Sequence, residues 1–154
     1  MLMKTKQDSL GFLIADVSRL MRDAFRRRLE GSSLTLAQAR ALVYVSRNEG
    51  IRQVELADML EIQPISLARL IDQLSEATLV ERRPDPADRR AYQLFLKPAA
   101  AAQLAAIEQV GTAIRADALA GIDTQQAEVL RLALNTMRAN LAALPRRHAK
   151  EKPE

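Results

Sequence analysis

The stretch from Gln53 to Leu96 constrains the fold more than any other part of this chain of 154 residues. It reads in order as a helix, a short turn at residues 61–62, a second helix opened by a proline, and a basic hairpin. A turn this short suits a helix-turn-helix that reads DNA, although two packed helices alone would equally suit a helical bundle. The expected packing positions of the first helix are Val54, Leu56, Ala57 and Leu60.

The second helix has one apolar face and one polar face. Pro64 suits the first helical position, which makes Gln63 the expected cap residue. An exposed helix start suits the major groove, where arginine can bond guanine and glutamine or serine can reach other base edges. The apolar face, spaced i, i+3, i+4 and i+7, consists of Leu67, Leu70, Ile71 and Leu74. The residues expected to contact DNA are Gln63, Pro64, Ile65, Ser66, Arg69 and Gln73.

The hairpin that follows carries adjacent arginines at its expected tip. Residues 79–83 and 92–97 read as strands, and the loop 84–90 between them holds two prolines, two aspartates and two arginines. Prolines and aspartates stiffen a loop, and the negative potential of a narrow minor groove attracts guanidinium groups. Asp88 is expected to hold one neighbouring guanidinium in a fixed orientation. A solvated charged loop is the alternative, but the position after a recognition-type helix favours DNA contact through Asp88, Arg89 and Arg90.

Long apolar stripes occur at both ends of the chain. Residues 10–25 repeat apolar side chains along one helical face, and residues 130–144 repeat them at alternating four- and three-residue steps, as in a coiled-coil seam. The two stripes could fold on each other within one chain. Their length relative to the DNA-reading segment favours a homodimer instead. The expected dimer contacts are Leu10, Leu13, Val17, Leu130, Leu134, Met137, Leu141 and Leu144.

The string LARLIDQLSEATLVERRPDPADRRAYQLFL resembles the recognition helix and wing of the MarR-type winged helix-turn-helix regulators of bacteria. The resemblance covers nearly the whole chain and implies a homodimeric, ligand-responsive transcription factor, mainly α with a small β-hairpin wing. It places Ser66 and Arg69 on the recognition helix and Arg90 at the wing tip. Two residues depart from the family pattern: Thr78 replaces a common glycine before the wing, and Lys97 replaces a common helix-capping threonine after it.

Four segments follow from these observations. Residues 1–34 form an N-terminal dimerisation helix, 35–97 the winged helix-turn-helix domain, 98–144 the C-terminal dimerisation helices, and 145–154 a charged flexible tail. Pro98 is expected to open the first of the C-terminal helices. The resemblance further implies small aromatic or phenolic acids as effectors, bound where the first, second and fifth helices meet. The corresponding wall residues, which would serve equally well in a core, are Phe12, Leu13, Asp16, Arg40 and Leu42.

Composition excludes several other function classes. The absence of cysteine excludes thiol-based sensing, disulfides and cysteine-bound metals, and agrees with a reducing cytoplasm. The single His148 lies in the charged tail, so neither a catalytic triad nor a metal or other cofactor is expected, and an enzyme is disfavoured. A net charge of +4 modestly favours a polyanionic partner. No apolar run is long enough for a membrane helix, and residues 1–7 are too short and polar for a signal peptide, so we expect a cytoplasmic protein.

The sequence therefore predicts a sequence-specific transcriptional regulator, a repressor by resemblance, that binds double-stranded DNA at a near-palindromic operator. A homodimer would place its recognition helices about 34 Å apart, one turn of the double helix. The alternative is a winged-helix module that binds an acidic protein through its basic wing. Steep salt dependence and preference for one operator would distinguish DNA recognition from this alternative.

Overall fold

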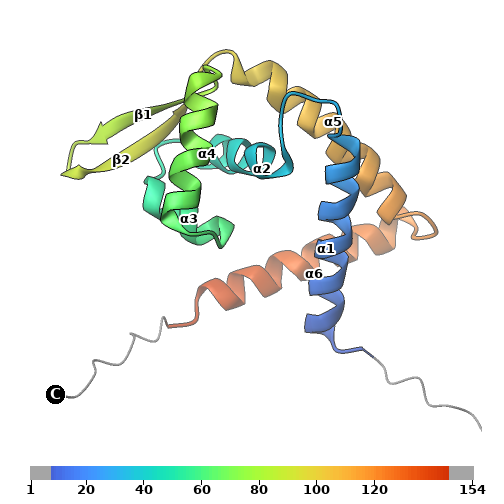
Figure 1. The fold of residues 1–154 in the computed structure, drawn as a ribbon. Helices are drawn as coiled ribbons and strands as arrows, with labels where there is room; N and C mark the ends of the chain where they lie inside the picture. The colour runs from blue at the N-terminus through green and yellow to red at the C-terminus, as the bar shows by residue number, and fades with distance from the viewer. Residues whose placement is uncertain (1–7, 146–154) are drawn as a thin grey trace, which may run out of the picture. The chain divides into compact units, whose positions relative to one another are not determined.

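The computed structural model describes residues 8–145, which fold into six helices and one two-stranded antiparallel sheet (Figure 1). The mainly α fold with a small β-hairpin that the sequence predicts is confirmed. His148 and the rest of the predicted tail after Pro145 lie outside the described residues. The elements are α1 (Leu10–Arg28), α2 (Leu36–Arg47), α3 (Gln53–Leu60), α4 (Pro64–Glu76), β1 (Val80–Asp85), β2 (Asp88–Leu96), α5 (Ala100–Ala118) and α6 (Thr124–Ala142).

By its internal contacts the chain divides into two units, residues 1–115 and 116–154. The first unit contains α1 to α4, the hairpin and most of α5, and the second contains α6 and the last turn of α5. The boundary therefore falls inside a helix. Contrary to the expectation that Pro98 opens α5, the helix begins at Ala100, because residues 97–100 first form a turn in which the Ala100 amide donates to the Lys97 carbonyl.

One core joins α2, α3, α4 and the base of the hairpin. Full burial of a large aliphatic side chain contributes roughly 1.5–3 kcal/mol, so this core supplies most of the driving force for the first unit. Val54 is the exception to the predicted packing of α3: its side chain is 56% exposed, whereas Leu56, Ala57 and Leu60 are buried. The largest fully buried side chains are Leu42, Val45, Leu56, Leu67, Ile71, Leu74, Val80 and Leu94.

The helix-turn-helix turn is closed by a left-handed residue at the end of α3. Glu61 has φ 56°, and the amides of Glu61 and Ile62 donate to the carbonyls of Asp58 and Ala57. These two bonds form the Schellman motif, which terminates a helix and reverses the chain. The next helix, α4, begins at Pro64 as predicted, and its apolar face is buried, with Leu70 half-buried at the edge.

The hairpin is longer and tighter than the sequence analysis predicts. The strands pair in register from Val80 with Leu96 to Pro84 with Tyr92, and after an irregularity at Pro84 and Asp85 they close with Asp85 opposite Asp88. Pro84 is tolerated because a proline can occupy an edge strand, where no ladder amide is needed. Arg89 and Arg90 therefore lie on β2 rather than in a loop.

The segment before α3 is hydrogen-bonded to the hairpin. The Gly50 amide donates to the Leu94 carbonyl, and the Leu94 amide donates to the Ile51 carbonyl, both at 2.9 Å. Arg52 then forms an isolated bridge with Gln93. Gly50 can make this turn because its φ of +84° is a conformation that glycine adopts without strain. The start of α3 and the second wing strand are therefore one continuous hydrogen-bonded structure.

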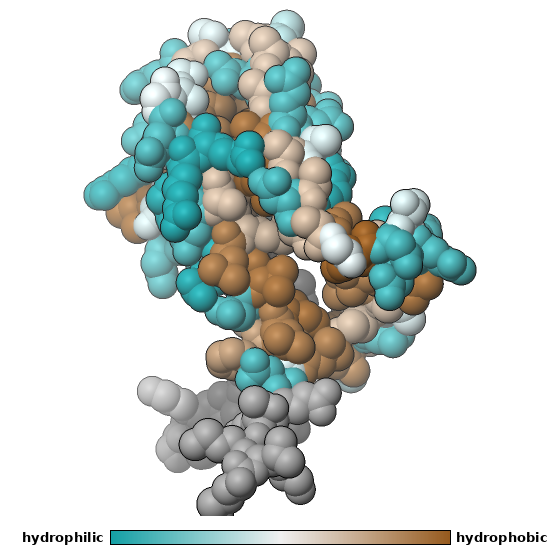
Figure 2. Space-filling model, turned by 90° about the vertical axis from the view of Figure 1, so that its right-hand side faces the viewer, coloured by the Kyte–Doolittle hydropathy of each residue, from teal (hydrophilic) through white to brown (hydrophobic). Residues whose placement is uncertain are grey.

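The helices α1 and α6 have no buried residues within the described part of the chain. Figure 2 shows apolar residues in brown gathered on the lower part of the visible face, at the height of the first half of α1 in Figure 1. None of the helices within residues 8–145 is long and apolar enough to cross a membrane. The exposed apolar residues of the two helices are Leu10, Phe12, Leu13, Ile14, Val17, Leu20, Val129, Leu130, Leu132, Leu134 and Leu141.

Replacing Thr78 with glycine is expected to stabilise the protein. Thr78 ends α4 at φ 59°, and the amides of Thr78 and Leu79 donate to Ser75 and Leu74 in a second Schellman motif. A left-handed conformation costs a residue with a Cβ about 1–2 kcal/mol. Thr78→Gly should therefore raise the free energy of unfolding in urea by about 1 kcal/mol. Thr78→Ala is the control, because it keeps the Cβ, and an equal gain in both variants would contradict this explanation.

Candidate nucleic-acid interface

The first turns of α4 present polar and apolar side chains to solvent. Ile65 is 66% exposed, and Ser66 and Arg69 are exposed beside it on the face opposite the core. Within residues 8–145 no carboxylate pairs with the Arg69 guanidinium. Gln63 occupies the cap position, but its side chain accepts no hydrogen bond from the helix start. The free amides and the unpaired cation suit an anionic, hydrogen-bonding partner.

Gln73 lies further along the same helix and differs from the other predicted contacts. It is exposed, but its side-chain oxygen accepts a hydrogen bond of 2.8 Å from the side-chain nitrogen of Gln38 on α2. This hydrogen bond connects α4 to α2 one helical turn after Arg69. The predicted role of Gln73 in base reading therefore competes with a structural contact inside the domain.

The wing presents two arginines on β2. Asp88, Arg89 and Arg90 are all exposed. The expectation that Asp88 holds a neighbouring guanidinium is wrong: its carboxylate accepts the backbone amide of Arg90 at 3.0 Å. The reason is local, since an aspartate readily bonds the amide two residues later. No ion pair engages the guanidinium of Arg89 or Arg90 anywhere in the described chain.

Arg82 joins the wing to both helices of the helix-turn-helix. From β1, its guanidinium donates to the Gln53 side-chain oxygen at 2.8 Å, to the Asp72 carboxylate at 2.7 Å and to the Ala68 carbonyl at 3.0 Å. The planar guanidinium can satisfy three such acceptors at once. The sequence analysis missed this residue. The two-residue strand period, which puts Arg82 on the same face as the buried Val80, could have revealed it.

Asp85 anchors the far end of the wing. Its side chain is only 5% exposed, and its carboxylate forms an ion pair with Arg52 Nε at 2.6 Å and accepts a hydrogen bond from the Ala87 amide at 2.9 Å. A buried carboxylate needs such partners, because desolvation of an unpaired charge is costly. Neither Asp85 nor Arg52 was predicted as a site residue from the sequence. The run of prolines and aspartates indicates a turn, and nothing in the local pattern pairs Asp85 with a residue 33 positions earlier.

A groove of about 350 Å³ separates the helix-turn-helix from the wing. It brings together three predicted DNA contacts, Pro64 from α4 and Asp88 and Arg90 from β2. It also contains residues that were not predicted to contact DNA, at the start of α3 and further along β2. The full lining is Arg52, Gln53, Val54, Pro64, Asp88, Arg90, Ala91 and Tyr92.

Comparison with known proteins identifies the family of this chain. The sequence signature of the MarR family matches residues 32–91, from α2 into the wing. The crystal structure of the transcriptional regulator PA3341 is 34% identical, covers 88% of this chain and 100% of that chain, and superposes with a TM-score of 0.74. The chain belongs to the MarR family. MarR-family transcriptional regulators are DNA-binding proteins and not enzymes.

Two further similar proteins agree with this assignment. The crystal structure of wild-type MarR from E. coli, in its apo form, is 25% identical, covers 86% of this chain and 98% of that chain, and has a TM-score of 0.75. A protein of Thauera aromatica, named as a candidate transcriptional regulatory protein for the hcr operon, is 35% identical over 68 residues. That match spans 44% of this chain but only 41% of the Thauera protein.

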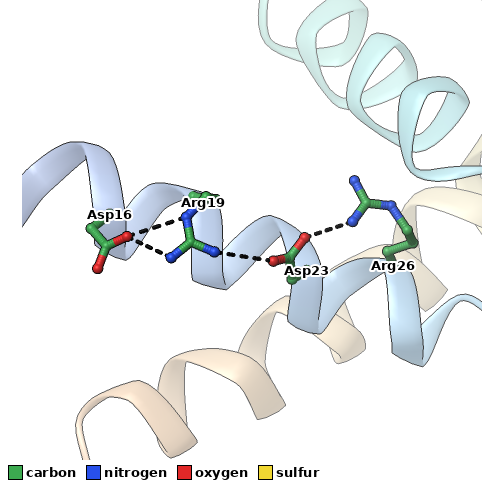
Figure 3. A network of polar contacts seen from close by, with 4 residues as sticks. All are labelled: Asp16, Arg19, Asp23 and Arg26. Carbon is green, nitrogen blue, oxygen red and sulfur yellow. Dashed lines mark hydrogen bonds and ion pairs between the residues drawn. The ribbon is translucent and has the colours of Figure 1, made fainter.

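The effector-site residues inferred from the MarR resemblance have different surroundings in the structure. Phe12 and Leu13 are exposed, Leu42 is fully buried in the core, and Asp16 belongs to a surface chain of ion pairs along α1 (Figure 3). In that chain Asp16 and Arg19 are 2.6 Å apart, and Arg19 also lies 3.6 Å from the next carboxylate. The remaining residue, Arg40, lines a hollow of about 680 Å³ between α1 and α2, together with Arg22 and Arg26.

Proposed function

We propose that this protein is a ligand-responsive repressor that acts as a homodimer on a near-palindromic operator. The observation that carries the proposal is the position of Arg69 and Arg90. Both are exposed, both lack an ion pair within residues 8–145, and they come from the recognition helix and the wing of one domain. Arginine on such a helix can bond guanine in the major groove, and arginine on a wing suits the minor groove.

Dimerisation is supported by the apolar faces of α1 and α6. The predicted contacts on these helices are exposed or half-buried in the single chain, including Leu13 and Val17 on α1 and Leu134 and Met137 on α6. Apolar surface on this scale commonly marks a protein interface. A twofold dimer would present two recognition helices about 34 Å apart, which matches one turn of DNA and a palindromic site.

Ligand response is supported by the hollow between α1 and α2. Its wall combines apolar side chains, such as Leu29 and Leu34, with three arginines, and this chemistry suits a small aromatic acid of the kind that the family resemblance implies. A ligand changes DNA affinity only to the extent that it binds one arrangement of the dimer more tightly than the other. The absence of cysteine agrees with a cytoplasmic location for such a regulator.

Selection of bound duplexes from a random oligonucleotide pool, at near-physiological salt, tests this function. We expect recovery of an inverted repeat with half-site centres about one helical turn apart. Binding to that repeat should weaken steeply as salt rises. Recovery of no common sequence, with weak binding that ignores sequence, would instead favour the protein-interaction alternative.

Replacing Arg69 or Arg90 with alanine should change specificity in different places. Arg69→Ala should relax the preferred base in each half-site, because a bidentate arginine contact is worth about 1–3 kcal/mol of discrimination. Arg90→Ala should weaken binding mainly to operators with A·T-rich flanks, where a narrow minor groove attracts arginine. Binding of each variant to half-site and flank libraries measures both effects. Wild-type selectivity in both variants would refute the assigned roles.

A further inference from the structure

We infer that Arg52, oriented by Asp85, binds a backbone phosphate of the DNA strand that crosses the groove between the helix-turn-helix and the wing. This inference rests on the proposed DNA-binding function and adds to it a contact site on the phosphodiester backbone. Neither Arg52 nor Asp85 is among the contacts that the sequence predicts.

The position of the groove determines its occupant. Pro64 at the start of the recognition helix lines one side, and Arg90 and Tyr92 of the wing line the other. If the helix enters a major groove and the wing the adjacent minor groove, one sugar-phosphate strand must pass between them, because that strand is the boundary between the two grooves. The groove is therefore continuous with the proposed interface and lies where a backbone must run.

The charge of the groove is complementary to a phosphate. Arg52 and Arg90 both line it, and its single lining carboxylate, Asp88, is bonded to the Arg90 amide. The start of α4 also borders it, and no side-chain hydrogen bond caps that start. By contrast, α1, α2 and α6 are each capped by a side-chain oxygen. The partial positive charge of this uncapped helix start adds to that of the arginines.

Asp85 makes Arg52 a pre-oriented ligand rather than a flexible surface cation. The buried carboxylate forms an ion pair with Arg52, whose Nε lies 2.6 Å from a carboxylate oxygen, and the Arg52 side chain remains 39% exposed and lines the groove. Its terminal N–H groups carry no hydrogen bond to the rest of the described chain. An arginine held in this way loses little conformational entropy when it binds a phosphate. Asp85 is thus a positioning residue, and Arg52 is the contact.

The apolar lining fits the sugar part of the backbone. Val54 and Tyr92 both line the groove, and both are substantially exposed although they are large and apolar. Deoxyribose offers an apolar surface between phosphates, which such side chains can cover. The exposure of Val54, which contradicts its predicted packing role, is then explained by contact with DNA.

The test measures salt dependence and phosphate interference on the duplex recovered by selection. Arg52→Gln should weaken binding about equally for all sequences and lower the slope of log affinity against log salt by about one per subunit. In the wild type, a neutral methylphosphonate at one position in each half-site should weaken binding. In Arg52→Gln that same substitution should have no effect, while other positions keep theirs.

Two further variants separate the contact from general damage. Arg52→Gln combined with Asp85→Asn removes both charges, so no unpaired buried carboxylate remains, and it should show the same reduced slope with near wild-type thermal stability. Arg131→Gln removes an equal charge from α6, where Arg131 pairs with Glu128, and it should keep the full slope. A wild-type slope and interference pattern in Arg52→Gln would overturn the inference alone. Failure of the wild-type protein to select any sequence would overturn the proposed function as well.

Discussion

Replacing Leu134 and Leu141 together with glutamate is expected to convert the protein from a dimer into monomers that remain folded. Both side chains lie on the apolar stripe of α6 and are exposed in the single chain, so the change costs no packing within a protomer. In a dimer, the same positions would bury four carboxylates in an apolar contact, and the cost of desolvating them exceeds the stability of most interfaces.

Loss of the dimer should reduce operator binding severely. Two linked DNA-reading domains gain avidity because the second half-site is bound intramolecularly, and this gain is typically 10²- to 10⁴-fold. The double variant should lose a factor in about that range. Sedimentation velocity measures the oligomeric state, and titration of the selected duplex measures the affinity. Circular dichroism should show unchanged helix content.

A matched control uses the opposite side of the same helix. At 100° per residue, Gln125 and Ala139 lie across α6 from the stripe, and both are exposed. Gln125→Glu with Ala139→Glu adds two acidic residues to the same helix and should leave the dimer intact. A monodisperse dimer from the Leu134 and Leu141 variant would refute the predicted interface, and monomers from the control would show that charge on α6, rather than the stripe, determines assembly.

Replacing Arg82 with methionine should have the second largest effect, because it uncouples the wing from the recognition helix. Arg82→Met keeps the length and the apolar stem of the side chain but removes all three hydrogen bonds, to Gln53, Asp72 and the Ala68 carbonyl. Hydrogen bonds to a charged group contribute about 1.5–3 kcal/mol, less where solvent reaches them. We expect the free energy of unfolding to fall by about 2 kcal/mol and operator affinity to fall at least tenfold, on the order of 1.4 kcal/mol.

Arg83 supplies the control for this change. It is the next residue on β1, but its guanidinium stays within the wing, where it pairs with Glu81 and lies 4.0 Å above the centre of the Phe95 ring. Arg83→Met should change stability by less than about 1 kcal/mol, as expected for an exposed ion pair. Urea denaturation and operator titration measure both variants. Equal losses for the two arginines would show that Arg82 acts through its charge alone.

The fold could be predicted because its signals are local. Periodic apolar residues in α4 and the proline at its start occur within a few residues of one another, and both are present as predicted. Thr78, which departs from the family pattern, adopts the left-handed conformation that the more common glycine would adopt. Such features depend on backbone geometry that a short window of sequence specifies.

The remaining details of the site could not be predicted because they depend on contacts between distant residues. The pair Arg52 and Asp85 and the bonds from Arg82 to Gln53 join positions about 30 residues apart, and no spacing rule connects them. Asp88 was assigned to the wrong partner because a carboxylate beside two arginines also has a backbone amide within reach. The extent of the wing was underestimated because proline and aspartate are typical of turns as well as of irregular edge strands.

The hydrogen bonds that join residues 50–51 to Leu94 have a consequence for regulation. Together with the hydrogen bonds of Arg82, they attach the hairpin to the helices at two separate places. The angle between the recognition helix and the wing is therefore fixed within each subunit. In the proposed ligand-responsive dimer, an effector would therefore have little freedom to change the geometry of one subunit's DNA-binding domain. It would instead change the distance between the two domains, so a single operator half-site should bind equally well whether or not the effector is present.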